Sequence, residues 1–335
     1  MKTLRVGIIG CGNMGRRHAR AYKFHKPRTQ LMGCYDVVRS SAESLAVEFA
    51  CDVEQSMEAL LARDDIDAVS ICTVETAHLE PVVKAARAGK HVLLEKPMAT
   101  SMSDALAMQK AAAEANIKFM IAHLFRFDAR CTEVKHIINS GRIGEVVSVD
   151  CRFHGTPTQQ DRIKETELSI FVFRGCHGID LMRCYTESEP IRVYAESKEG
   201  ALREQGYHSE DAVFCLMRFQ SGAIGSIEIN SHVPPGHPTA GQSSLTVIGT
   251  KGMIEQDLAT PWLTISDKQG VTLSQGNQKD LWFREEIDAF VRHVLDEGPN
   301  IATPADAIAA LRISLAAVDS ACSHRPVSLN WDDQQ

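Results

Sequence analysis

Several features that would assign a protein to a special class are missing from this chain of 335 residues. No apolar run approaches the roughly 18 residues that a membrane-spanning helix needs. The opening lacks a signal-peptide profile, because the apolar run 4–9 is far too short. The net charge is −7, and acidic and basic residues are interspersed, so no basic stripe indicates nucleic acid and no charge run indicates a tail. We therefore expect a soluble, cytoplasmic protein without nucleic-acid or membrane partners.

Cysteine is comparatively frequent, but its spacing does not indicate a metal site. None of the ten cysteines forms Cys-x-x-Cys, and no cysteine–histidine set has zinc-finger spacing. Cys176 stands beside His177, yet adjacent residues on a helix do not face each other, which argues against a nucleophile–base pair. We expect reduced, mostly buried thiols and no bound metal.

The chain opens with a pattern typical of a dinucleotide-binding unit. The apolar run 4–9 leads directly into a glycine motif, and a helical pattern follows over 16–24. The first glycine allows a tight turn, the second lets backbone approach a pyrophosphate, and the third lets helix and strand pack closely. Free N–H groups at the helix N-terminus favour phosphates. The candidate cofactor-binding residues of this motif are Gly10, Gly12, Asn13, Met14 and Gly15.

A candidate ribose-binding residue follows this motif. The apolar run 30–35 ends in Asp36, which comes 21 residues after Gly15. A carboxylate at this place accepts hydrogen bonds from ribose hydroxyls and would repel a 2′-phosphate, which favours NAD over NADP. Arg39 is close by and can accommodate a 2′-phosphate, so NADP stays open. The alternative interpretation of Asp36 is a solvated turn residue.

Strand-like apolar runs alternate with helix-length amphipathic segments in the first third of the chain. This order predicts an α/β fold, a doubly wound parallel sheet of Rossmann type over residues 1–122. The apolar runs stand at 6–9, 31–35, 68–72, 91–94 and 119–122, and the helical segments near 13–24, 40–49, 76–88 and 101–115.

Residues 123–335 show a different order and predict an α+β domain for substrate binding and oligomerisation, with a large open, mainly antiparallel sheet. Strand patterns stand at 146–154, 191–197, 212–219, 223–231, 244–248, 253–255 and 263–265, and helical patterns at 124–140, 176–185, 280–296 and 303–322. Over 223–231 both alternating faces carry apolar residues. A partly apolar outer face favours a homodimer or homotetramer through this sheet, although a merely mixed solvent-exposed face is the alternative.

Glu95 and Lys96 directly follow the apolar run 91–94, where a strand is expected to end. In open α/β sheets, ligands lie beyond the carboxyl ends of the strands. A lysine beside an oxidised nicotinamide meets positive charge and partial burial, which both lower its pKa and allow it to accept a proton. The alternative is an ordinary exposed lysine at a strand end.

Three motifs together resemble the Gfo/Idh/MocA family of NAD(P)-dependent sugar and cyclitol dehydrogenases. They are the glycine motif, the segment 72–78, and Glu95-Lys96-Pro97. The resemblance covers nearly the whole chain. It implies that Thr73 and His78 line the cofactor. It also implies that Glu95 lies near the nicotinamide and that Lys96 contacts the reacting hydroxyl.

The same resemblance implies a substrate pocket formed by the second domain. His123 and Arg126 match a segment at the sugar pocket, although Arg126 has an alternative role in a structural ion pair. His177 matches the catalytic histidine, and Asp180 matches a downstream, more structural aspartate. The chain departs from the family at Phe173, where the family carries an aspartate four residues before the histidine.

Other polar residues are weaker candidates for the pocket. Asp161, Glu165 or Glu167 of the preceding loop are candidates to replace the missing aspartate. His154, Arg152 and His237 are further pocket candidates, and their alternative is an exposed strand or loop face.

The implied reaction is reversible hydride transfer between a secondary alcohol of a sugar, sugar derivative or cyclitol and a nicotinamide cofactor. Lys96 or His177 accepts the hydroxyl proton, and the other stabilises the developing alkoxide. One alternative is an oxidoreductase of a non-sugar ring, a dihydrodiol or a carboxylated cyclohexadiene, because Phe173 is apolar. The other is a non-catalytic NAD(H)-binding regulatory protein.

Overall fold

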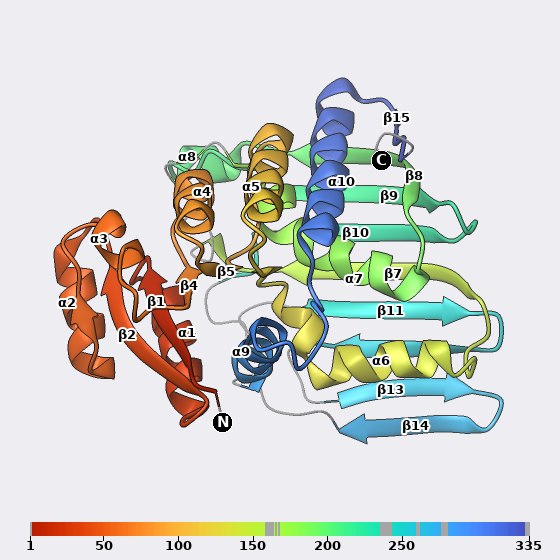
Figure 1. Cartoon of the computed structure of the whole chain (residues 1–335). Helices are drawn as coiled ribbons and strands as arrows, with labels where there is room; N and C mark the ends of the chain where they lie inside the picture. Colours follow the sequence, from red (N-terminus) through yellow and green to blue (C-terminus); the bar gives the residue numbers. More distant parts are fainter. Residues whose placement is uncertain are drawn as a thin grey trace. The chain divides into compact units, whose positions relative to one another are not determined.

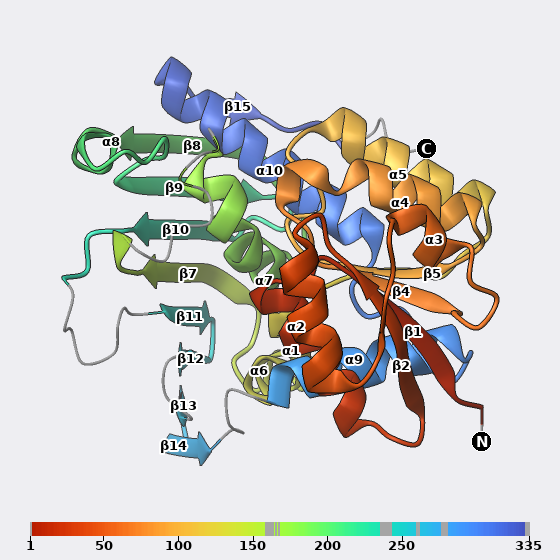
Figure 2. The same ribbon diagram turned by 90° about the vertical axis from the view of Figure 1, so that its left-hand side faces the viewer.

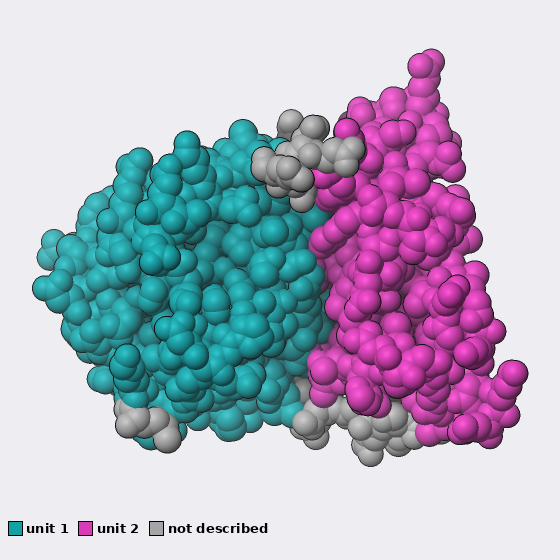
Figure 3. Space-filling model, turned by 45° about the vertical axis from the view of Figure 1, so that its right-hand side comes forward, with its two compact units in different colours: residues 1–127, 279–311 teal, residues 128–278, 312–335 magenta. Residues whose placement is uncertain are grey.

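The computed structural model describes residues 2–157, 164, 166, 168–234, 243–258, 262–275 and 281–331. The chain divides into two compact units (Figure 3). Unit 1 comprises Met1–Phe127 and Lys279–Leu311, and unit 2 comprises Asp128–Gln278 and Arg312–Gln335. Each unit has its own sheet, and each is described separately below.

Unit 1 is built on a six-stranded parallel sheet of order β3-β2-β1-β4-β5-β6 (Figure 1). This order confirms the predicted doubly wound sheet, in which ligands bind where the strand order reverses, between β1 and β4. The strands are short. β4 and β6 are buried along their whole length and β5 is buried except at His91, as expected for a sheet covered on both faces. They are β1 (Leu4–Ile9), β2 (Thr29–Tyr35), β3 (Asp52–Val53), β4 (Ala68–Ile71), β5 (His91–Leu94) and β6 (Phe119–Ile121).

The helices of unit 1 connect these strands. They are α1 (Asn13–Phe24), α2 (Arg39–Phe49), α3 (Met57–Leu61), α4 (Leu79–Arg87) and α5 (Met102–Glu114), with short 3-10 turns η1 (Glu75–Ala77) and η2 (Leu124–Phe127). The predicted helical segments are confirmed within a few residues. The short elements β3 and α3 were not predicted, because two and five residues give no measurable periodicity.

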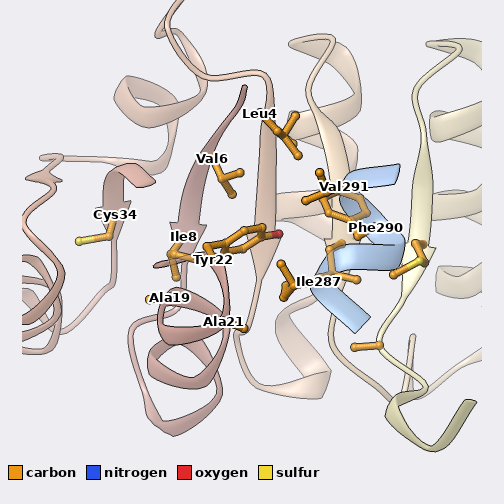
Figure 4. Packing of buried hydrophobic residues seen from close by; sticks show 14 of the residues in the cluster. Leu4, Val6, Ile8, Ala19, Ala21, Tyr22, Cys34, Ile287, Phe290 and Val291 are labelled. Atoms are coloured by element: carbon orange, nitrogen blue, oxygen red, sulfur yellow. The ribbon is translucent and has the colours of Figure 1, made fainter. Parts of the chain in front are cut away.

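Helix α9 (Leu281–Val294) and the first part of α10 (Pro304–Ser323) also belong to unit 1, which differs from the predicted boundary at residue 122. The reason is packing: α9 lies against α1, and its buried Ile287 and Phe290 join the core of Ile8 and Tyr22 (Figure 4). His25, just after α1, lies 2.8 Å through Nε2 from the carbonyl oxygen of Arg284. A contact between helices so distant in sequence leaves no local pattern.

Unit 2 carries a nine-stranded sheet of order β14-β13-β12-β11-β7-β10-β9-β8-β15 (Figure 2). All neighbours are antiparallel except β7 and β10, which pair in parallel, so the prediction of a large, mainly antiparallel sheet is confirmed. The strands are β7 (Val146–His154), β8 (Pro190–Lys198), β9 (Ala212–Phe219), β10 (Ile224–Asn230), β11 (Ser243–Gly249), β12 (Gly252–Asp257), β13 (Trp262–Asp267), β14 (Gly270–Gln275) and β15 (Val327–Ser328).

One face of this sheet is covered by helices. These include α6 (Ala129–Asn139) and α7 (Cys176–Thr186), which continues the π-helical turn η4 (Phe171–Gly175). A short helix, α8 (Ala201–Glu204), precedes β9. A β-carbon added to Gly178 would lie 2.7 Å from Ile227 and 2.9 Å from Cys151, so α7 packs directly on the odd-numbered face of β7 and β10. The helix expected at 124–140 is interrupted at Asp128, whose carboxylate accepts the N–H of Arg130 and caps α6.

Candidate active site

The glycine turn between β1 and α1 has the geometry that its sequence predicts. Gly10 has a φ of +90°, which a residue with a side chain rarely adopts. A β-carbon on Gly15 would lie 2.1 Å from the carbonyl oxygen of Gly10, so no other residue fits. A β-carbon on Gly12 would meet no described atom within 4 Å. The turn is therefore closed at Gly15 and open at Gly12, where a ligand can approach the backbone.

Asn13 and Met14 form the first residues of α1, whose first turn carries no acidic residue. The first N–H groups of a helix have no partner within it and favour negative charge. Asp36 lies directly after β2 and accepts the N–H of Cys11 at 2.6 Å and that of Val38 at 2.8 Å. Arg39 forms an exposed ion pair with Glu43 at 2.9 Å. The structure thus brings the candidate ribose residue next to the glycine turn.

Thr73 and His78 belong to the segment after β4. The hydroxyl of Thr73 donates to the carbonyl oxygen of Ala77 at 3.3 Å. The ring of His78 is buried, and its nitrogens lie 3.3 Å from the carbonyl oxygen of Thr73 and 3.2 Å from that of Met98. Burial lowers the pKa of His78 and favours its neutral form. His78 therefore links the segments after β4 and β5.

Glu95 and Lys96 follow β5 directly and are buried, with exposed fractions of 1% and 8%. The carboxylate of Glu95 accepts the backbone N–H of Lys96 at 3.1 Å, and the peptide bond between Lys96 and Pro97 is cis. This places Lys96 at the carboxyl edge of the sheet, where a ligand is expected. The interpretation of Lys96 as an ordinary exposed lysine is therefore wrong.

Sequence reasoning missed two residues that surround Glu95. His18 of α1 places its Nε2 atom 3.1 Å from Oε1 of Glu95 and 3.8 Å from Oε1 of Glu286 in α9. His18 and Glu286 are completely buried. His18 stands three residues after Gly15, which is the only signal that the sequence offered for this pair.

His123 and Arg126 lie in the segment after β6. His123 is buried. Arg126 donates through Nη1 to the carbonyl oxygen of Ile301 at 2.8 Å and pairs with Asp306 at 3.1 Å. This arginine holds the pKa of Asp306 at about 2 despite the burial of that carboxyl. The structure therefore favours the ion-pair interpretation of Arg126, with Asp306 as the partner instead of Asp128, which pairs with Arg130.

The candidate catalytic histidine lies in unit 2. His177 is the second residue of α7, and Asp180 is buried one turn later on the same helix. Phe173 lies in the preceding π-helical turn and is also buried, so an apolar ring takes the position of the family's aspartate. Asp161, Glu165 and Glu167 lie outside the described residues, as does His237.

Arg174 is a second functional candidate that sequence reasoning missed. Its Nη1 atom is shielded from solvent and has no hydrogen-bond partner among the described residues. Burial lowers the pKa of this guanidinium to about 10, and no acidic side chain in the described part of the chain opposes the shift. Arg174 precedes His177 by three positions, so the two side chains emerge from neighbouring positions of the helical stretch.

Arg152 and His154 are not brought together with His177. Both are even-numbered residues of β7, and this strand buries its odd-numbered residues against α7. His154 lies 2.9 Å from Glu228, and Arg152 lies 3.2 Å from Asp150, on the opposite face of the sheet. The placement of these two residues in a pocket with His177 is therefore corrected: they belong to the outer face.

Comparison with known proteins identifies the family. A model described as "Oxidoreductase family, NAD-binding Rossmann fold" matches residues 4–123, and the GFO/IDH/MocA C-terminal domain matches residues 131–255. This chain belongs to the GFO/IDH/MocA family. The resemblance inferred from the three motifs is thereby confirmed, and the chain is an oxidoreductase of an NAD-binding family.

Individual relatives cover most of the chain. An inositol 2-dehydrogenase of Rhizobium meliloti is 28% identical and covers 98% of this chain and 99% of its own. A 2,7-anhydro-N-acetylneuraminate hydratase of Escherichia coli is 29% identical over 76% of this chain and 68% of its own. The solved structure of a myo-inositol 2-dehydrogenase from Lactobacillus plantarum has a TM-score of 0.86 at 24% identity, covers 98% of this chain and 100% of that one, and shows the same fold.

The residues of this GFO/IDH/MocA protein fit a bound dinucleotide. The open space above Gly12 leaves room for a pyrophosphate, the N-terminus of α1 favours its charge, and Asp36 provides an acceptor for ribose hydroxyls. In the described part of the chain, no helix has both the length and the apolar character to span a membrane.

Two glycine variants test this fit. Gly12→Ala is expected to fold normally, because its methyl group meets no described atom, yet to weaken NADH binding about tenfold or more by intruding on the pyrophosphate. Gly15→Ala is expected to lose about 1–3 kcal/mol of unfolding free energy as well, because helix and strand must separate. Fluorescence titration with NADH and urea unfolding measure the two effects. Equal NADH affinity of Gly12→Ala and the parent protein would contradict the assigned pyrophosphate site.

Proposed function

We propose that this protein catalyses the reversible NAD-dependent oxidation of a secondary hydroxyl group on a cyclitol, sugar or sugar derivative. The observation that carries the proposal is Lys96, buried at the carboxyl end of β5 and held through its backbone by Glu95. A relative that matches nearly the full length of this chain is named inositol 2-dehydrogenase, which supports a polyhydroxylated ring as substrate.

Lys96 and His177 divide the proton chemistry in this proposal. NAD, when bound, accepts the hydride of the alcohol carbon. One of the two side chains accepts the hydroxyl proton, and the other donates a hydrogen bond to the oxygen as negative charge develops. With Phe173 in place of an aspartate, these two residues work without a carboxylate at that position.

Asp36 supports NAD as the preferred cofactor. Its carboxylate is fixed beside the glycine turn by two backbone N–H groups, at the position where a 2′-phosphate would be repelled. Arg39 forms an ion pair with Glu43 on the surface of α2. Among the described residues, no interaction joins Arg39 to the carboxylate of Asp36.

A second candidate function is favoured by Arg174. Nη1 of Arg174 is shielded from water, and the guanidinium has no acidic partner among the described residues, which costs free energy. A ligand carboxylate would offset that cost by forming a charge-assisted, bidentate hydrogen bond. A carboxylate-bearing ring, such as a carboxylated cyclohexadiene or an acidic sugar, is therefore the alternative substrate class. The apolar ring of Phe173 beside Arg174 suits such a substrate better than it suits a row of hydroxyl groups.

The outer face of the nine-stranded sheet supports a homo-oligomer. Phe214, Leu216 and Ile224 are 54%, 62% and 52% exposed, and they lie on neighbouring strands β9 and β10. Charges of both signs surround them, including Asp150, Arg152, Arg192, Glu196, Arg218 and Glu228. A two-fold interface needs a self-complementary patch, and an apolar centre with charges of both signs provides one. We propose that a second copy of this chain covers this face, in a dimer or in a tetramer built from such dimers.

The main proposal predicts NAD reduction with a panel of inositols and aldoses. Turnover is expected with at least one of them, about tenfold or more faster with NAD than with NADP, because Asp36 disfavours the 2′-phosphate. Lys96→Met is expected to lower kcat about 10²–10⁴-fold, because a proton acceptor or donor is lost. The affinity of Lys96→Met for NADH should stay within about threefold of that of the parent protein, because the lysine is expected to contribute mainly in the transition state.

Absorbance at the NADH band and fluorescence titration measure these effects, with Lys110→Met, an exposed lysine of α5, as the matched control. NADH binding without turnover of any panel member, and no effect of Lys96→Met, would favour the regulatory interpretation instead. Turnover confined to aromatic dihydrodiols would exclude the sugar class.

The carboxylate alternative predicts a charge-dependent change in KM. Arg174→Met keeps the length of the side chain and removes its charge, so KM for a uronate or carboxylated cyclitol should rise about tenfold or more, with KM for a neutral inositol nearly unchanged. Arg192→Met, on the outer sheet face, is the control. An equal response of neutral and acidic substrates to Arg174→Met would reject a carboxylate-binding role.

The oligomer proposal predicts dissociation when a charge is introduced at the apolar centre. Leu216→Lys is expected to shift the protein toward its 36.9 kDa monomer, because a lysine would be buried without a partner in the interface. Leu106→Lys, on an exposed position of α5, should leave the assembly unchanged. Sedimentation velocity distinguishes the outcomes, and a monomeric parent protein would refute the proposed interface.

A further inference from the structure

A buried row of polar side chains leads from α1 to the backbone of Lys96, and the proposed chemistry does not use it. The hydroxyl of Tyr22 lies 2.9 Å from Oγ of Ser70, and Oγ of Ser70 lies 3.3 Å from Nδ1 of His18. Nε2 of His18 lies 3.1 Å from Oε1 of Glu95, whose Oε2 accepts the N–H of Lys96 at 3.1 Å. Helix α1, strand β4 and the segment directly after β5 carry the row, and all three belong to unit 1.

One direction of donation satisfies the whole row. Burial raises the pKa of Tyr22, which keeps its hydroxyl protonated and able to donate to Ser70. Ser70 then donates to Nδ1 of His18, and this fixes the tautomer in which Nε2 carries the proton. His18 therefore donates to Glu95, so that both oxygens of this carboxylate are held, one by His18 and one by the backbone of Lys96.

Glu286 of α9 lies near the same ring nitrogen of His18 as Glu95, with its Oε1 atom 3.8 Å from Nε2. It is fully buried, and neither of its oxygens has a hydrogen-bond partner among the described residues. Burial and the neighbouring charge of Glu95 raise the pKa of Glu286 well above its usual range, which favours the neutral form of this carboxyl. An ionised Glu286, 3.8 Å from Nε2, would compete with Glu95 for the proton of His18.

We propose that His18 is a positioning residue for Lys96 that acts through Glu95, and that Glu286 supports it as a neutral carboxylic acid. The catalytic part of this inference rests on the proposed dehydrogenase function. Glu95 is the intermediate element, because its Oε1 lies within hydrogen-bond distance of His18 and its Oε2 accepts the backbone N–H of Lys96. Loss of the His18 donor would remove the hydrogen bond to Oε1, so the carboxylate that accepts the Lys96 N–H would be held less firmly.

Variants along the row give a graded test. His18→Phe removes the donor to Glu95 and is expected to lower kcat at least tenfold, with NADH affinity within threefold. Ser70→Ala should have a smaller effect, because His18 keeps its Nε2 proton in part of the population. Tyr22→Phe, at the far end, should stay within threefold and serves as the matched control. His18→Gln retains an N–H donor, so its kcat is expected to exceed that of His18→Phe. It also replaces His18→Phe in the test if the latter does not fold.

Glu286 is tested by a substitution that imitates its neutral form. Glu286→Gln keeps the shape without the ability to ionise, so kcat is expected within threefold of the parent protein. A loss of tenfold or more in Glu286→Gln would show that the ionised form is required and would overturn this assignment. Thermal unfolding of each variant separates a positioning role from a purely structural one. If the residue only stabilises the fold, the substitution lowers the melting temperature but leaves kcat unchanged at temperatures where the variant is folded.

A measurement without turnover keeps this inference separate from the proposed function. Reductive methylation with ¹³C-formaldehyde labels lysines, and the signal of Lys96 is assigned by its absence in Lys96→Arg. His18→Phe should shift or broaden the Lys96 signal in the cofactor-free protein, and Tyr22→Phe should not. An unchanged signal and an unchanged kcat in folded His18→Phe would overturn the positioning role. A shifted signal in a protein that oxidises no polyol would retain the positioning of Lys96 and reject the dehydrogenase function.

Discussion

The close approach of α1 to β1 at Gly15 is the contact on which the candidate site depends. A β-carbon there would lie 2.1 Å from the carbonyl oxygen of Gly10, so the helix can start at this place only with glycine. The same helix presents its N-terminus to the expected pyrophosphate and carries His18 and Tyr22 into the interior. One backbone contact thus positions both the glycine turn expected to bind the cofactor and the row of polar side chains that leads to Lys96.

The sequence predicted most of unit 1 because its signals are local. A glycine turn, an acidic residue after the second strand and a lysine after the fifth are each defined by a few neighbouring residues, and the carboxyl ends of parallel strands bring them to one edge. The polar row was not predictable in the same way. Glu286 belongs to α9, which follows strand β14 of the second unit and returns to the first, and its buried carboxyl has no periodic signature.

The sequence did contain the information needed to assign residues of β7 to one face of the sheet. Arg152 and His154 share their parity in β7 with Asp150, and alternation of two residues places all three on one side of the sheet. Residue type alone suggested a pocket, but the period-2 pattern assigns them to the face opposite α7. Arg174 differs from these, because its significance lies in a buried nitrogen that has no hydrogen-bond partner among the described residues. Burial of a single atom cannot be inferred from a helical pattern.

The two units differ in how far they follow the family, and this difference bears on function. In unit 1 the glycine turn, His78 and Glu95-Lys96-Pro97 are all present, and close packing or hydrogen bonds hold each of them. In unit 2 an apolar ring stands at Phe173 in place of the family's carboxylate, directly before Arg174, whose Nη1 atom is shielded from solvent. A positive charge beside an apolar ring favours an anionic ligand group over a hydroxyl group, and this is the physical basis of the carboxylate alternative proposed above.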